Sequence, residues 1–207
     1  MAITTYAELK TNIADFLNRS DLTSVIPTFI SLAEVDLDRK IRHWRMEKRS
    51  TTTLDTQYSQ FPQDFLEPIR LSLTTGNTSR LELLSQAQMM EQRELNRNNT
   101  GTPRFYAITD GSIEVFPTPD SDTIILEMVY YARTEALSDS NTTNWLLTYY
   151  PDALLYGALV HSAPYLADDP RTQVWGTLLQ NAIGAINAES DKAKFGGTGH
   201  KMKFRSY

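Results

Sequence analysis

The feature that most constrains the fold of this 207-residue chain is an apolar stripe between residues 21 and 42. Apolar side chains recur there at steps of three and four residues: Ile26, Phe29, Ile30, Ala33, Leu37 and Ile41. This spacing is typical of one face of a helix. A helix of about 18 residues is roughly 27 Å long, and it is stable in water only when another surface covers its apolar face. The rest of the chain must therefore supply a packing surface of that length.

A shorter helix is predicted directly before this stripe. Thr5 and Glu8 have the spacing of a capping box, and they precede apolar residues at helical spacing that end at Leu17. Only residues 18–21 separate the two predicted helices. Helices joined so closely pack as an antiparallel hairpin.

Past Trp44 the hydrophobic period changes from that of a helix to that of a strand. We expect about five to seven strands and one short helix, near residues 85–96, from the β-prone runs between turn signals. The clearest turn is Asp110-Gly111, because this pair can supply the positive φ angles of a two-residue hairpin. The middle of the chain therefore predicts a small antiparallel β domain.

Helical periodicity returns after residue 136. Pro151 is suited to the first turn of one helix, and a long last helix is expected from Pro170 to about Lys194. We therefore predict an α+β protein in which two N-terminal and two C-terminal helices form one bundle and the β domain is inserted between them. The predicted parts are an N-terminal helical hairpin (1–45), the inserted β domain with one short helix (46–135), C-terminal helices (136–194) and an extended, flexible basic arm (195–207).

The predicted arm differs from the rest of the chain in charge. The net charge is −5, yet residues 192–207 carry five basic side chains and no acidic one. Basic residues interleaved with aromatic ones could bind nucleic acid, or they could dock onto an acidic partner protein. The acidic body of the chain favours the protein partner. The candidate binding residues of the arm are Phe195, Lys201, Lys203, Phe204, Arg205 and Tyr207.

No residue pattern specifies a catalytic, metal-binding or cofactor-binding site. The chain has no cysteine, which excludes disulfides, thiolate metal sites and cysteine nucleophiles. The histidines, His43, His161 and His200, lack metal-ligand partners at helical spacing, so we expect structural or surface roles for them. No apolar run reaches the length of about 18 residues that a membrane span needs.

Aromatic residues gather around the C-terminal helices. They are Trp145, Tyr149, Tyr150, Tyr156, Tyr165 and Trp175. One interpretation is that they fill the core of the bundle. The other is that some of them form a subunit interface, where tryptophan and tyrosine are enriched.

Several segments, taken in order, resemble one protein family. They lie at residues 20–34, 61–66, 103–106, 130–132, 137–139, 143–147, 151–152, 156–159 and 193–197. The most recognisable of them are Thr143-Asn144-Trp145-Leu146-Leu147 and Tyr156-Gly157-Ala158-Leu159. The ordered set resembles the head-to-tail adaptor (connector) proteins of tailed bacteriophages, especially short-tailed ones.

The resemblance implies a structural virion protein without cofactor or membrane anchor. Such adaptors are made in the host bacterial cytoplasm and form a ring, commonly of twelve identical subunits, in the neck beneath the portal. The helical bundle builds the ring wall, the C-terminal arm reaches the portal protein, and tail nozzle and tail fibre proteins attach to the other side. DNA passes through the lumen without sequence-specific binding.

Two other functions are compatible with some features of the chain. A virion-associated cell-wall hydrolase would need two carboxylates in a cleft, one of them with a raised pKa. The sequence contains many acidic residues and does not single out such a pair. A DNA-binding module is disfavoured by the negative net charge.

Overall fold

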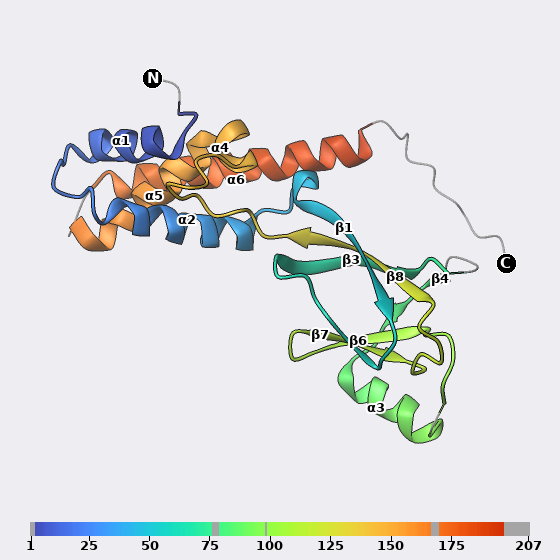
Figure 1. Ribbon diagram of the computed structural model, residues 1–207. Helices are drawn as coiled ribbons and strands as arrows, with labels where there is room; N and C mark the ends of the chain where they lie inside the picture. Colours follow the sequence, from blue (N-terminus) through green and yellow to red (C-terminus); the bar gives the residue numbers. More distant parts are fainter. Residues whose placement is uncertain (1–2, 76–78, 98, 167–169, 197–207) are drawn as a thin grey trace. The chain divides into compact units, whose positions relative to one another are not determined.

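The computed structural model describes residues 3–75, 79–97, 99–166 and 170–196. The chain divides into two compact units, one made of Met1–Arg45 with Thr134–Tyr207 and the other of Met46–Arg133. We call them the helical unit and the β unit, and Figure 1 traces both in chain order. The helical unit is thus assembled from the two ends of the chain, while the β unit is one continuous insertion.

Five helices make up the described part of the helical unit. They are α1 (Tyr6–Leu17), α2 (Ile26–Lys40), α4 (Trp145–Tyr149), α5 (Pro151–Leu166) and α6 (Thr172–Phe195). The capping box predicted for α1 is confirmed, because Thr5 Oγ1 accepts the Glu8 N–H at 3.3 Å and the Glu8 carboxylate accepts the Thr5 N–H at 3.0 Å. A short helix, α4, was not expected from the sequence.

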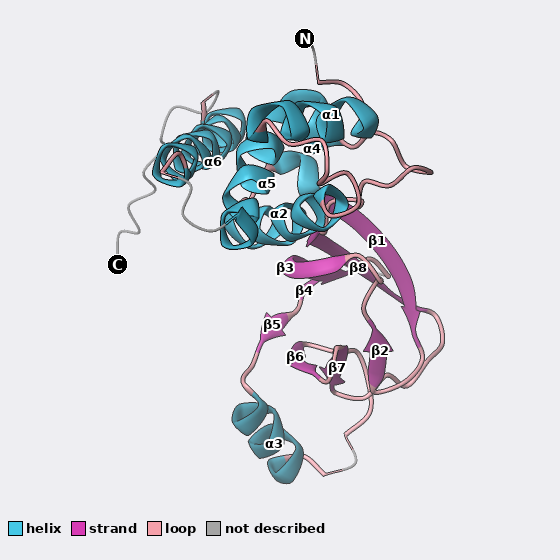
Figure 2. Cartoon of the chain, turned by 90° about the vertical axis from the view of Figure 1, so that its left-hand side faces the viewer, coloured by secondary structure: helices cyan, strands magenta, loops and turns pink. Residues whose placement is uncertain are grey.

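The centre of the helical unit is the contact between α2 and α5. All six apolar residues of the predicted stripe are buried. Gly157 of α5 faces Ala33 of α2, and a Cβ atom added at Gly157 would lie only 2.9 Å from the Ala33 Cβ. The two helices can therefore approach this closely only because residue 157 has no side chain. Figure 2 shows α5 between α2 and α6.

The last helix is fixed to the end of α2 by side chains that replace missing backbone partners. Asn187 accepts the Arg42 N–H at 3.1 Å and donates to the Lys40 carbonyl at 3.2 Å. The Ser190 hydroxyl accepts the Trp44 N–H at 3.1 Å. Because the last carbonyls of a helix lack internal partners, these bonds hold the C-terminal ends of α2 and α6 side by side.

The β unit contains two four-stranded sheets. One has the order β1-β8-β3-β4 and the other β2-β7-β6-β5. The elements are β1 (Glu47–Leu54), β2 (Tyr58–Gln60), β3 (Phe65–Leu73), β4 (Ser79–Arg80), β5 (Glu82–Leu83), α3 (Gln86–Leu95), β6 (Phe105–Thr109), β7 (Ser112–Phe116) and β8 (Ile124–Ala132). The predicted combination of helices with an inserted β region is confirmed.

The chain changes sheet at Leu81. Its N–H donates to the Leu71 carbonyl in the first sheet, and the next residue, Glu82, donates its N–H to the Arg104 carbonyl beside the second sheet. The short run of residues 79–83 is therefore split between two sheets, as β4 and β5. The β5–β6 pair is parallel, whereas the other strand pairs described are antiparallel.

The β unit keeps its core between apolar residues of both sheets. The buried cluster comprises Leu54, Leu71, Leu73, Leu81, Tyr106, Ile113, Val115, Ile124, Leu126, Met128, Tyr130 and Ala132. The hairpin predicted at Asp110-Gly111 is confirmed, with φ angles of 45° and 70° between β6 and β7. Local turn chemistry thus sets the register that brings the β6 and β7 residues into this core.

Candidate protein-interaction surfaces

Two carboxylates on α2 hold the chain where it re-enters the helical unit. The Leu137 N–H donates to Glu34 Oε1 at 2.9 Å, and the Asn144 side-chain amide lies 3.4 Å from the same oxygen. One turn later, Asp38 accepts the Thr134 N–H at 3.2 Å. Burial raises the pKa of Glu34 to about 7, and the hydrogen bonds from Leu137 and Asn144 oppose this shift. The two carboxylates hold backbone N–H groups in place, so their role is structural.

His43 anchors an aromatic cluster at the end of α2. The Arg45 N–H donates to Nδ1 of this fully buried ring at 3.2 Å, so the proton of the neutral ring is on Nε2, 3.3 Å from the Tyr150 hydroxyl. The ring stacks on Trp145 with a centroid distance of 5.3 Å. Burial lowers the pKa of His43, which keeps the ring neutral. The histidine therefore organises the cluster and has the structural role expected for it.

The two other histidines have different positions. His161 is half-buried on α5, and its Nε2 atom has no hydrogen-bond partner among the described residues. His200 lies outside the described residues. In the described part of the chain no group of three or more histidine and acidic side chains could hold a metal ion.

Two exposed aromatic side chains and the half-buried Arg45 lie beside the His43 cluster. The Arg45 guanidinium lies 4.4 Å from the ring centroid of Trp44 and 3.8 Å from that of Tyr149. Both aromatic side chains are exposed. We call Trp44, Arg45 and Tyr149 the aromatic shelf. Tryptophan, tyrosine and arginine are the residue types that contribute most to binding energy at protein interfaces, so the shelf is a candidate docking surface.

The sequence anticipated this surface only in part. Of the six aromatic residues predicted to be core or interface, Trp175 is buried, whereas Tyr149 and Tyr165 are exposed. Trp44 and Arg45 were missed because they follow the end of α2 and are far from Tyr149 in the sequence. One feature of the sequence could have indicated them. Trp44 and Arg45 follow directly after a predicted helix, and the tryptophan is not part of the apolar stripe that the helix buries.

The structure describes one of the six predicted arm residues. Phe195 is the last residue of α6 and is exposed. The other five candidates lie outside the described residues: Lys201, Lys203, Phe204, Arg205 and Tyr207. Because Ser190 contacts the backbone of Trp44, the last turn of α6 begins close to the aromatic shelf.

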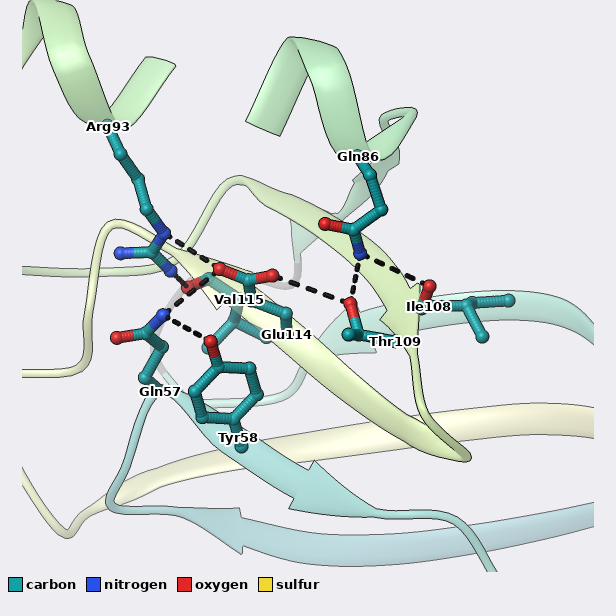
Figure 3. A network of polar contacts seen from close by, with 8 residues as sticks. All are labelled: Gln57, Tyr58, Gln86, Arg93, Ile108, Thr109, Glu114 and Val115. Atoms are coloured by element: carbon teal, nitrogen blue, oxygen red, sulfur yellow. Dashed lines mark hydrogen bonds and ion pairs between the residues drawn. The ribbon is translucent and has the colours of Figure 1, made fainter. Parts of the chain in front are cut away.

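In the β unit, a buried carboxylate fixes α3 to the second sheet. Figure 3 shows Glu114 of β7 accepting from Arg93 Nε at 2.8 Å and from the Gln57 amide at 3.0 Å. Arg93 also donates to the Val115 carbonyl at 2.9 Å. At the other end of the helix, Gln86 donates to the Ile108 carbonyl and to Thr109 Oγ1. Both ends of α3 are therefore anchored.

Helix α3 also has exposed apolar side chains. Met90 and Leu95 are among the most exposed large apolar side chains of the described chain, and Glu91 and Glu94 lie beside them. An anchored helix that presents methionine and leucine to solvent is a second candidate docking surface. It belongs to the β unit, whereas the aromatic shelf belongs to the helical unit.

A third buried carboxylate, Glu127 of β8, lies between two arginines of the first sheet. Arg49 donates to Oε2 through Nε at 2.7 Å, and Arg70 donates to Oε1 at 2.8 Å. Hydrogen bonds from Arg49 hold the pKa of Glu127 below its usual range. Each of Glu34, Glu114 and Glu127 is thus bound to donors from its own unit, and these interactions give each carboxylate a structural role.

The comparison with known proteins identifies one family. The sequence model described as SU10 adaptor protein matches residues 4–200. No curated protein matches the chain. The matched range includes both compact units. Among the described residues, no helix combines the length and apolar character needed to cross a membrane.

Proposed function

Because the chain belongs to the SU10 adaptor protein family, we propose that it forms the ring that joins the portal to the tail and lets DNA pass. The resemblance to head-to-tail adaptors of tailed phages is confirmed, and the role is that of a structural protein of the virion neck. The single observation that carries the proposal is the family match over residues 4–200, which spans the helical and β units together. Twelve identical subunits per ring is the number that the resemblance implies.

An adaptor must bind partners on two sides, and the chain offers a separate candidate surface in each unit. In the helical unit, the aromatic shelf lies beside the last turns of α6, where the basic arm begins. In the β unit, α3 presents Met90 and Leu95. We assign the arm and the shelf to the portal protein and α3 to the tail nozzle or fibre proteins.

The assignment of the arm rests on charge. The last sixteen residues carry five basic side chains, whereas the rest of the chain carries 15 basic and 25 acidic ones. A basic, glycine-containing segment is poorly suited to its own core and is well suited to an acidic groove on another protein. The contact residues of the arm are then Phe195, Lys201, Lys203, Phe204, Arg205 and Tyr207.

The acidic body also supports the passage of DNA. A lumen with net negative charge repels phosphate groups, so DNA slides through it with little binding. Neutralising the acidic residues that line the channel is expected to slow DNA ejection. An unchanged ejection rate would contradict this part of the proposal.

The experiment is to measure the mass of the protein alone and after mixing with portal rings, by light scattering or native mass spectrometry. We expect a discrete portal–adaptor assembly. Deleting residues 197–207, which leaves α6 intact, is expected to abolish the assembly without unfolding the protein. Replacing Lys201, Lys203 and Arg205 with glutamine tests the charge alone.

A matched control removes the same charge elsewhere. Arg80, Arg97 and Arg104 are exposed in the β unit, and their replacement with glutamine is expected to leave portal binding unchanged. Normal portal binding by the deletion variant would show that the arm is not the docking element. If the protein does not bind portal rings at all, the proposed position next to the portal is wrong.

A further inference from the structure

The last helix has a second face that the described residues of its own unit leave exposed. The helix contacts α5, and the apolar residues that it buries are Trp175, Leu179, Ala182, Ile183 and Ile186. A second row, which we call the outer seam of α6, consists of Val174, Leu178, Asn181, Ala185 and Ala188. All five are exposed, Val174 by 59% and Leu178 by 37%. Figure 2 shows α6 at one side of the helical unit with α5 as its neighbour.

The spacing and composition of the outer seam are those of a helix contact. Its members alternate in steps of four and three residues, which is the pattern of helices packed as in a coiled coil, and the seam extends over about 21 Å. A second observation is independent of the spacing: residues 172–188 contain no charged side chain. A helix that is permanently exposed on one side carries charged residues there, so this seam is expected to be covered in the assembled protein.

A matching seam is present on α2. Thr28, Leu32 and Val35 follow the same four-three spacing, and Leu32 and Val35 are each 47% exposed. The outer seam of α2 is also uncharged. Its apolar members have large side chains, whereas the side chains in the middle of the outer seam of α6 are small. Leucine and valine side chains can insert between Asn181, Ala185 and Ala188 as knobs into shallow holes. An uncharged surface against an uncharged surface desolvates no ion.

The two seams lie on different helices, and neither seam includes the residue through which its helix lies next to Gly157 of α5, which is Ala33 on α2 and Leu179 on α6. A contact between two different faces of identical subunits is heterologous, and such a contact closes into a ring when the rotation permits. The bonds of Asn187 and Ser190 place the C-terminal ends of α2 and α6 together, so the two helices run in the same direction.

This common direction is compatible with a ring of many subunits. In a ring of twelve, each copy is rotated by about 30° from its neighbour, so α2 of one copy stays nearly parallel to α6 of the next. Helices packed in this manner cross at about 20° with a scatter of about 15 to 20°. We infer that the outer seam of α6 binds the outer seam of α2 on a second copy of this chain. The inference rests on the proposed ring and names the contact that builds it.

A cross-linking experiment tests the contact directly, because the chain has no cysteine of its own. Leu32→Cys in one molecule and Ala185→Cys in another are mixed and treated with a short bismaleimide, with and without portal rings. We expect a cross-linked dimer. The control mixture pairs Leu32→Cys with Gln180→Cys, which is exposed on α6 outside the outer seam and is expected to give little product.

A charge variant tests the energetic contribution of the seam. Ala185→Glu is expected to fold normally, since the site is exposed in the single chain, and to raise the concentration needed for ring assembly at least about tenfold. Gln180→Glu introduces the same charge on the same helix and is expected to assemble like the unmodified protein.

The outcomes separate this inference from the proposed function. If the unmodified protein forms a portal assembly, but neither the cross-link nor the Ala185→Glu defect is seen, the contact is wrong and the adaptor role stands. If the unmodified protein ignores portal rings, the proposed portal role fails. A specific cross-link in either condition supports the contact, and its absence in both overturns it.

Discussion

The two units of this adaptor each bury a glutamate, and the pKa values of these two glutamates are shifted in opposite directions. Glu34 of the helical unit and Glu127 of the β unit are each 7% exposed. Among the described residues, a backbone N–H and a side-chain amide donate to Glu34, and burial raises its pKa to about 7. Glu127 lies between Arg49 and Arg70, and its pKa is lowered. Burial dominates the pKa shift at Glu34, whereas the hydrogen bonds from guanidinium groups outweigh burial at Glu127.

Glu34 and Glu127 should therefore contribute to the pH dependence of stability with opposite signs. The pKa of Glu34 is higher in the folded state than its ordinary value of 4.5, so the folded state binds the proton more tightly. Its contribution to stability is present below about pH 4.5 and is lost as the pH rises through 7. The pKa of Glu127 is lowered, so its contribution is present at neutral pH and is lost on acidification.

The largest expected effect concerns Glu114, the buried carboxylate that binds Arg93. Glu114→Ala removes the acceptor of Arg93 and leaves the guanidinium, whose side chain is only 26% exposed, without its carboxylate. Breaking such a pair costs about 3 kcal/mol or more of unfolding free energy. Hydrogen exchange of the β6, β7 and α3 amides measures the loss. Glu94→Ala, on the exposed side of α3, is the control and should change little; equal exchange in both variants would show that the network does not hold α3.

The next effect breaks the comparison at Glu34. Glu34→Gln keeps an acceptor for the Leu137 N–H and removes the titration. Between pH 5 and pH 8 the unfolding free energy of the unmodified protein should fall by about 2 to 3 kcal/mol because of Glu34, and the variant should not show this fall. The three tryptophans all belong to the helical unit, so their fluorescence in urea titrations reports on this unit. The same pH slope in both proteins would exclude Glu34 as its cause, and Asp38→Asn distinguishes the neighbouring carboxylate.

The smallest effect sharpens the comparison at Glu127. Arg49→Met removes one of the two guanidinium groups, so the pKa of Glu127 should rise toward its ordinary value. The stability at pH 7 should change little, because the Arg49 side chain is 67% exposed and the ion pair is screened by water. A carboxyl titration by NMR measures the shift. Arg80→Met, in the same sheet but outside this ion pair, serves as the control; an unmoved Glu127 titration in Arg49→Met would assign the lowered pKa to Arg70 alone.

The candidate surfaces were predictable only where a sequence pattern was local. Tyr149 was identified as a possible interface residue from the aromatic cluster around the C-terminal helices, and it is exposed. Trp44 and Arg45 complete the aromatic shelf from the other end of the chain. No sequence period connects residues that are brought together by the packing of α2 against the α4–α5 segment. The arm residues 197–207 remain a prediction, because they lie outside the described residues.

The sequence by itself determined the elements whose signals lie within a few residues of each other. The capping box at Thr5 and Glu8, the Asp110-Gly111 hairpin and the apolar stripe of α2 are of this kind. Their physical basis is local: a side chain satisfies a nearby N–H, a positive φ angle needs a permissive residue, and a 3.6-residue period puts apolar groups on one face. The ordered similarity of short segments also identified the family.

Only the tertiary structure decided what distant residues do for one another. It ended the strand at Arg80 and began another at Glu82, because Leu71 and Arg104 offer carbonyls from different sheets. It paired Glu34 with Leu137 and left Glu127 between two arginines, and so it gave two glutamates opposite pKa shifts. Burial and partner charge are properties of the folded surroundings, which no residue carries in its own identity.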